Sequence, residues 1–244
     1  MKIAKEILAR VWALWGLVSF VTTFLIIFIP SMCCYLIPGK KGQDIFIAIS
    51  RIWMTFWLHI IGCPVTVTGK EYFALNKAYI VTYNHNALLD VPLSAPCIPA
   101  GNKTIAKSSF TKIPLFGWFY RKGSVIVDRK SDASRLKSFD DMKNVLQQGI
   151  HMCIYPEGTR NRTKDPLKKF YSGAFKLAVE TKTQIMPAVI FNTRKAMPIH
   201  KTFYLWPYRL RLHFLEPVDA TNISADELKD KVFKIMWDHY EANQ

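Results

Sequence analysis

The stretch that decides the fold is Tyr79-Ile80-Val81-Thr82-Tyr83, followed directly by Asn84-His85-Asn86-Ala87-Leu88-Leu89-Asp90. The first five residues carry no charge and are mostly apolar or β-branched, which is typical of a strand buried on both faces. Strands of that kind belong to parallel sheets that helices cover on both sides. The polar residues that follow therefore stand where a buried strand passes into a helix.

Strand and helix patterns alternate along the rest of the chain. Short alternating or fully apolar runs predict strands at residues 64–68, 104–106, 124–127, 152–155, 185–191 and 210–215. Apolar stripes at helical spacing predict helices over residues 132–148 and 173–181. A last helix opens with Ser224 and Glu227, which form a capping-box pair. This alternation predicts an α/β fold with a mostly parallel sheet flanked by helices.

The N-terminal segment differs in composition from the rest. No charge lies between Val11 and Gly39, and the apolar run Trp12–Ile29 would reach ~27 Å as a helix, close to a hydrocarbon core of ~30 Å. A second apolar segment, Ile45–Ile61, contains Arg51 and His59, which favours an interfacial helix. We therefore expect a membrane-embedded helix pair over residues 1–62, spanning the bilayer or entering one leaflet, and an α/β domain over residues 63–244. The alternatives are a signal peptide, which lacks its A-x-A cleavage site here, and a buried hairpin of a soluble protein.

Composition narrows the class of protein. Half of the 244 residues are hydrophobic, which excludes disorder. Lys and Arg number 33 against 18 Asp and Glu, and the net charge of +15 predicts an anionic partner: nucleic acid, an acidic membrane surface or a phosphorylated substrate. Five cysteines without a Cys-x-x-Cys pair argue against a disulfide framework or a zinc ribbon, and the histidines do not cluster as metal ligands do.

His85 and Asp90 can form a catalytic pair only in one local geometry. On a continuous helix their offset of five residues would leave them ~140° apart. They meet if His85 lies in the turn after the strand and Asp90 lies in the first turn of the helix. His85 would then be a neutral general base, and Asp90 would fix its tautomer and stabilise the imidazolium. The alternative is a turn histidine with a structural role.

A second polar segment, Tyr155-Pro156-Glu157-Gly158-Thr159-Arg160-Asn161-Arg162, begins at the end of the predicted strand at 152–155 and contains two arginines. Arginine offers a planar fork for phosphate, and glycine lets the backbone approach an anion. Glu157 would orient an arginine or accept a hydrogen bond from a substrate hydroxyl. The alternative is a solvated surface turn. A third candidate segment runs from Lys107 to Arg129. Its alternative interpretation is a helix and a hairpin with surface charges.

Taken together, these segments resemble the glycerolipid acyltransferase family. The NHxxxxD signature of that family matches Asn84, His85 and Asp90, and its Pro-Glu-Gly-Thr-Arg signature matches Pro156–Arg160. The resemblance covers roughly residues 60–215, and its other two blocks match Lys107, Gly123, Asp128-Arg129 and Pro187. The departures are Asn86, Ala87 and Leu88 inside the first signature, Tyr155 where Phe is usual, and Asn161 where Ser is common. These departures bear on the identity of the acceptor.

The resemblance implies a membrane-bound acyltransferase of phospholipid synthesis. It would move a fatty acyl group from an acyl thioester to the free hydroxyl of lysophosphatidic acid, giving phosphatidic acid. His85 would be the base and Asp90 its partner, and the acceptor would be bound by Glu157, Gly158, Thr159, Arg160, Lys107 and Arg129. No metal and no cofactor are implied, since the acyl carrier protein or coenzyme A thioester is a co-substrate.

The resemblance also implies a location in the cell. It leaves open alternatives for the acceptor and for the class of protein. The enzyme would sit at the inner (cytoplasmic) membrane, among membrane lipids, with its catalytic domain facing the cytoplasm. One alternative acceptor is a lyso amino-acid lipid. A different class is a non-catalytic basic protein that binds membranes or nucleic acid. Nucleic-acid binding is not expected, because much of the aromatic content falls in the apolar N-terminal segments and not in a basic groove.

Overall fold

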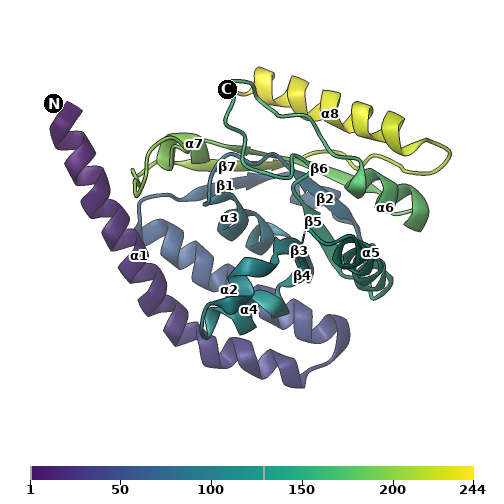
Figure 1. Cartoon of the computed structure of the whole chain (residues 1–244), viewed down its shortest axis with the longest axis horizontal. Coiled ribbons are helices and arrows are strands. Elements are labelled where there is room, and N and C mark those ends of the chain that lie inside the picture. The colour runs from purple at the N-terminus through teal and green to yellow at the C-terminus, as the bar shows by residue number, and fades with distance from the viewer. Residues whose placement is uncertain (1, 129) are drawn as a thin grey trace.

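Seven strands form one mixed sheet in the computed structural model, which describes residues 2–128 and 130–244 (Figure 1). Their order across the sheet is β1-β7-β6-β2-β5-β3-β4. Every neighbouring pair is parallel except β6 and β7, so the predicted mostly parallel sheet is confirmed. The strands are β1 Val65–Thr68, β2 Ile80–Tyr83, β3 Asn102–Lys107, β4 Ser124–Val127, β5 His151–Ile154, β6 Ile185–Phe191 and β7 Leu210–Phe214.

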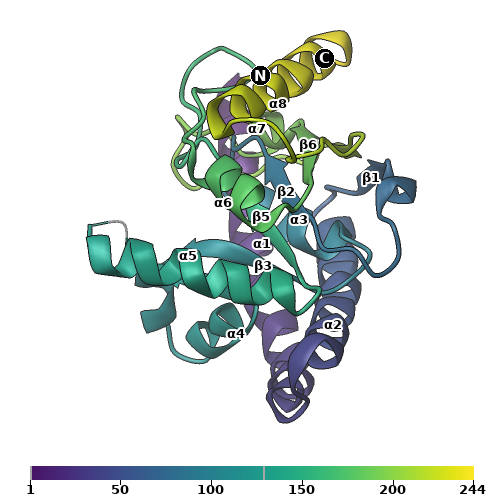
Figure 2. The same ribbon diagram turned by 90° about the vertical axis from the view of Figure 1, so that its right-hand side faces the viewer.

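Helices cover both faces of this sheet, as the two ribbon views show (Figures 1 and 2). Helices α5, α6 and α8 pack on one face, and α1 to α4 lie on the other. The short α7 follows β6. The helices are α1 Lys2–Cys33, α2 Gly39–Ile60, α3 Asp90–Cys97, α4 Phe116–Lys122, α5 Asp132–Gln147, α6 Gly173–Thr181, α7 Thr193–Ala196 and α8 Ala225–Ala242.

The central strands are buried on both faces, as their composition predicts. Successive side chains of a strand point to opposite faces of the sheet. Accordingly, Val81 and Tyr83 of β2 join the core beneath α1 to α3, whereas Ile80 joins the core beneath α5, α6 and α8. All seven residues of β6 are buried. The central strands β2, β5 and β6 are therefore enclosed on both faces, and the polar residues that the sequence singled out follow the ends of β2 and β5.

The N-terminal segment forms two helices, but only one of them fits a membrane by length and composition. The helical segment Ile3–Leu36 has a mean hydropathy of 2.2 over its most apolar window, of which only 22% is buried. No other described helix meets that test, so the expected membrane-embedded pair is corrected to one candidate. Helix α2 differs because its apolar face, including Phe46, Trp53 and Trp57, is buried inside the protein. The division at residues 62 and 63 stays a prediction.

Candidate active site

The turn that carries His85 is fixed at the end of β2. The side chain of Asn84 mimics a further backbone pair: its Nδ2 donates to the carbonyl of Ile190 at 2.9 Å, and its Oδ1 accepts from the Ile190 N–H at 2.7 Å. Asn84 is fully buried and thereby ties the end of β2 to β6. The chain leaves the sheet at a defined point, and α3 begins six residues later at Asp90.

His85 and Asp90 meet in the geometry that the sequence required. His85 Nδ1 lies 2.8 Å from Asp90 Oδ2, with the carboxylate fully buried and the imidazole 18% exposed. The same oxygen accepts from the backbone N–H groups of Asn86 at 2.6 Å and Ala87 at 2.7 Å. Because a carboxylate only accepts, Nδ1 carries the hydrogen and Nε2 is the basic nitrogen. The arrangement suits a general base.

The ring of Tyr155, which follows β5, supports the imidazole from the side. The two ring centroids are 4.6 Å apart, and the rings are inclined by 44°. The Tyr155 hydroxyl is 2.6 Å from Ser94 Oγ on α3, and this hydrogen bond fixes the position of the phenol ring. In the sequence, Tyr155 stood out only as a departure from a family pattern, and its contact with His85 had no local signal.

The loop after β5 holds the backbone of His85. Glu157 Oε1 accepts from the His85 N–H at 2.9 Å, and Asn161 donates its N–H to the His85 carbonyl at 2.6 Å. Glu157 also accepts from the Lys168 N–H at 3.3 Å. Its carboxyl is fully buried, and this burial raises its pKa to about 7 even though the two N–H groups act in the opposite direction. The structure thus places Glu157 behind His85, while its predicted contact with a substrate stays a prediction.

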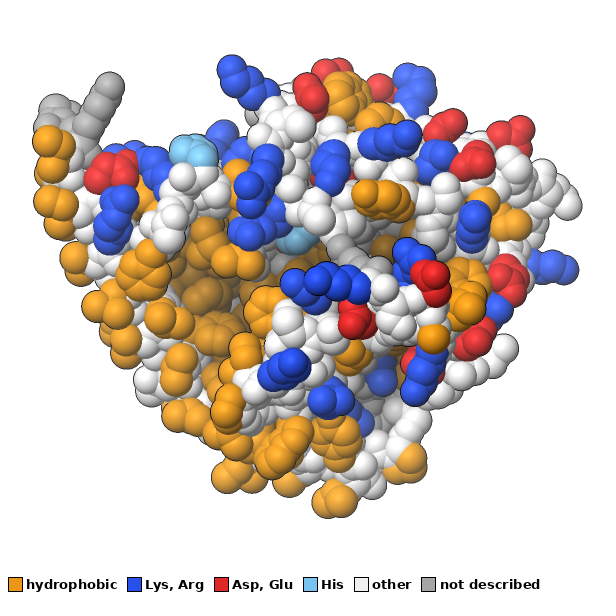
Figure 3. Space-filling view, viewed as in Figure 1, with side chains coloured by type: hydrophobic (Ala, Val, Ile, Leu, Met, Phe, Trp, Pro, Cys, Tyr) orange, Lys and Arg blue, Asp and Glu red, His pale blue; other side chains and the backbone are white. Residues whose placement is uncertain are grey.

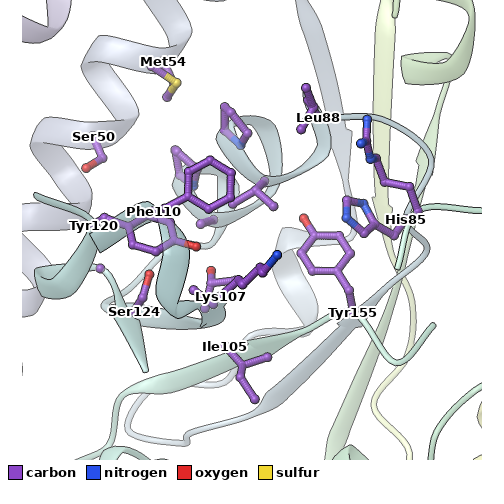
Figure 4. Close-up of a pocket in the computed structure, with 18 of the residues that line it drawn as sticks. Ser50, Met54, His85, Leu88, Ile105, Lys107, Phe110, Tyr120, Ser124 and Tyr155 are labelled. Carbon is purple, nitrogen blue, oxygen red and sulfur yellow. The ribbon is translucent and has the colours of Figure 1, made fainter. Parts of the chain in front are cut away.

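A cavity of about 1060 Å³ opens beside His85, and most of its wall is apolar. Figure 4 shows it running from His85 and Tyr155 past Lys107 and Phe110 to Ser50 and Met54 on α2. Of the predicted binding residues, the structure brings Lys107, Gly158, Thr159 and Arg160 to its wall. Arg129 lies outside the described residues. An apolar space with a basic rim suits a ligand that has a long chain and an anionic group.

Comparison with known proteins identifies the family. A family model described as Acyltransferase matches residues 64–191, which is more than half of the chain. The chain belongs to this acyltransferase family. The matched region includes β1 to β6, the His85–Asp90 pair and the Glu157 loop.

Named relatives and a solved structure resemble this acyltransferase. The chain is 29% identical to 1-acyl-sn-glycerol-3-phosphate acyltransferase of Saccharomyces cerevisiae, over 85% of this chain and 68% of the yeast protein. It is 24% identical to the alpha enzyme of that name from Mus musculus, over 84% of this chain and 71% of the mouse protein. The crystal structure of the LPA acyltransferase PlsC from Thermotoga maritima covers 99% of this chain and 97% of its own, with a TM-score of 0.81 and 22% identity. This last likeness confirms the fold.

Two further basic residues of the acyltransferase line the cavity together with Arg160. Arg162 belongs to the polar segment that the sequence singled out, whereas Lys168 was not predicted. Lys168 Nζ donates to Thr159 Oγ1 at 2.7 Å and to the carbonyl of Glu157 at 3.3 Å, so it braces the loop from within. The sequence offered no fixed spacing to separate Lys168 from its basic neighbours. Among the described residues, no three His, Cys, Asp or Glu side chains gather as metal ligands would.

Proposed function

We propose that this acyltransferase moves a fatty acyl group from an acyl thioester to the free hydroxyl of lysophosphatidic acid, giving phosphatidic acid. The observation that carries the proposal is the position of His85, between an apolar cavity and a rim of basic side chains. The cavity suits an acyl chain, and the rim suits a phosphate monoester. The names of the yeast and mouse relatives support the same acceptor.

The mechanism requires one proton to move twice. His85 Nε2 removes the proton of the acceptor hydroxyl while the oxygen attacks the thioester carbonyl. Asp90 stabilises the imidazolium that forms, because its Oδ2 lies 2.8 Å from Nδ1. The tetrahedral intermediate then breaks its carbon–sulfur bond, and the departing thiolate takes the proton from His85. The products are an ester and a free thiol, so no acyl-enzyme and no cofactor are needed.

The acceptor phosphate would be held by the basic rim. Arg160 is half-buried, and Lys107, Arg162 and Lys168 line the same cavity. An arginine can bind two phosphate oxygens at once, whereas a neutral acceptor would leave this charge without a partner. This contrast separates lysophosphatidic acid from acceptors without a phosphate.

The experiment offers three acceptors in parallel to detergent-purified protein with a labelled acyl thioester: lysophosphatidic acid, a monoacylglycerol and a lyso amino-acid lipid. We expect transfer to lysophosphatidic acid, and Arg160→Ala should raise the KM for it at least tenfold, a loss of about 1.4 kcal/mol. Lys169→Ala is the matched control, because Lys169 is exposed and lines neither of the two cavities described. If product forms only from the lyso amino-acid lipid, the proposed acyl transfer reaction stands, but lysophosphatidic acid is not the acceptor.

The proposal includes the donor and the location. The donor would be the thioester of acyl carrier protein or coenzyme A. The enzyme would be held at the inner (cytoplasmic) membrane by α1, with the catalytic domain in the cytoplasm. Support comes from the apolar outer face of α1, where Val11, Leu14 and Val18 are more than half exposed, and from the net charge of +15, which favours anionic headgroups.

A further inference from the structure

A second apolar space lies beside the first, between α1 and the body of the protein. It has a volume of about 770 Å³, and we call it the α1 groove. One wall is α1, through Leu17, Val21 and Leu25, and another wall is formed by residues 113–116, 197–199, 201 and 203–205. Figure 3 shows a hollow lined with hydrophobic side chains next to the N-terminal helix, with Lys and Arg side chains along its upper edge.

The α1 groove and the catalytic cavity meet near the reacting centre. The residues that line both spaces are Phe20, Leu88, Pro92, Phe110, Phe116 and Arg160. Leu88 belongs to the turn between His85 and Asp90, and Arg160 belongs to the loop that holds the His85 backbone. One molecule can therefore place a polar head near Arg160 and a chain in the groove while a second chain fills the catalytic cavity.

The walls of the two spaces differ in their exposure. At its α2 end the catalytic cavity is lined by buried side chains, among them Phe46, Ile47 and Met54. In contrast, Leu17, Val21 and Leu25 in the α1 groove are about half exposed. The groove is thus continuous with the exposed apolar face of α1, the face suited to a bilayer.

Resting on the proposed function, we infer that the α1 groove holds the single acyl chain of the lysophospholipid acceptor. The reaction brings together two acyl chains, and two apolar spaces meet at Leu88 and Arg160, next to His85, which lines the catalytic cavity. The acceptor is a lipid and reaches the enzyme from the bilayer, so its chain fits the space that opens along α1. The thioester donor has a polar carrier and arrives from water, so its chain fits the enclosed end beneath α2.

The test narrows the groove without touching the catalytic groups. Val21→Trp places a large ring on the groove wall, and Val18→Trp is the matched control on the same helix. The two valines are similarly exposed, at 47% and 51%, but only Val21 lines the groove. With a fixed donor, we expect Val21→Trp to raise the KM for oleoyl-lysophosphatidic acid at least tenfold over Val18→Trp. The KM for hexanoyl-lysophosphatidic acid should rise less than threefold.

A reciprocal variant distinguishes the space that holds the donor acyl chain from the space that holds the acceptor acyl chain. Ile105→Phe adds bulk to the catalytic cavity, whose wall includes Ile105. It should shift the preferred donor to a shorter acyl chain while the ratio of KM values for the two acceptors stays unchanged. The inference is overturned if Val21→Trp and Val18→Trp behave alike, or if Val21→Trp changes donor preference instead. If the unmodified protein transfers no acyl group to either lysophosphatidic acid, the proposed function itself fails, and the inference fails with it.

Discussion

At the scale of single residues, the imidazole of His85 is held from several sides, and the local sequence shows only one of them. Asp90 lies five positions along the chain and binds Nδ1. Tyr155 and Glu157 come from the end of β5, about seventy positions later, and contact the ring and the backbone N–H. The contact of Asp90 with His85 could be predicted from spacing and helix geometry. The contacts that Tyr155 and Glu157 make with His85 leave no such pattern, because these residues lie far from His85 in the sequence.

The first prediction concerns Asp90. Asp90→Asn should lower kcat by about 10²–10⁴-fold, because a neutral amide neither fixes the His85 tautomer as firmly nor stabilises the imidazolium. The KM values should change little, since Asp90 is fully buried and contacts the imidazole and two backbone N–H groups. Initial rates at saturating substrate measure the loss, and the melting temperature shows whether the variant is folded. A folded variant within threefold of the original kcat would contradict the assigned role.

The second prediction concerns the buried carboxyl of Glu157. Burial raises its pKa from the ordinary 4.5 to about 7 in the folded protein. Between these two values the unfolded chain releases this proton while the folded protein keeps it, so stability falls as pH rises. The loss should be about 3 kcal/mol between pH 4.5 and 7, and it should be absent from Glu157→Gln.

The readout for Glu157 is the difference between two melting curves. His151 is also buried, and burial lowers its pKa to about 4, which gives stability the opposite dependence on pH. His151 is present in both proteins, so its contribution cancels when the melting temperatures of the wild type and Glu157→Gln are subtracted at each pH. The wild type should lose melting temperature relative to the variant from pH 5 to 7. Parallel curves would contradict the pKa assigned to Glu157.

At the scale of elements, α1 and α2 share long apolar stretches in sequence but differ in their surroundings. Both are apolar and rich in aromatic residues, but α2 buries its Trp53 and Trp57 against the body of the protein. An apolar stripe is required for contact with either protein or lipid, so its presence does not tell which one it meets. By contrast, β4, α6 and β6 begin and end at the predicted residues. In each of them the sequence keeps one pattern along the whole element, either a regular periodicity or a continuous apolar run.

The third prediction concerns the outer face of α1. Changing Val11, Leu14 and Val18 together to Ser should weaken binding to anionic vesicles at least tenfold, because their apolar surface then no longer favours the bilayer. The matched control changes Leu75 and Leu136 to Ser, since both are exposed and neither belongs to α1. Vesicle sedimentation measures binding. Equal retention of the two variants would contradict an anchoring role for this face.

At the scale of the whole molecule, the site exists because of the strand order. β2 and β5 are parallel neighbours, so the loops that follow them meet at one edge of the sheet, and His85 contacts Glu157 there. Sequence patterns predicted both strands and both loops, but strand order depends on long-range pairing that no local pattern records. The two apolar spaces are harder still to predict, because each is lined by residues from widely separated parts of the chain.

The proposed role of His85 is tested by comparing the formation of phosphatidic acid by the wild type and by His85→Ala. Both proteins, purified in detergent and matched for melting temperature, would receive a labelled acyl thioester and lysophosphatidic acid. We expect labelled phosphatidic acid from the wild type and a rate at least 10²-fold lower from His85→Ala, because the variant lacks the imidazole that takes the hydroxyl proton. A folded His85→Ala protein that makes phosphatidic acid at the wild-type rate would contradict the assignment of His85 as the general base.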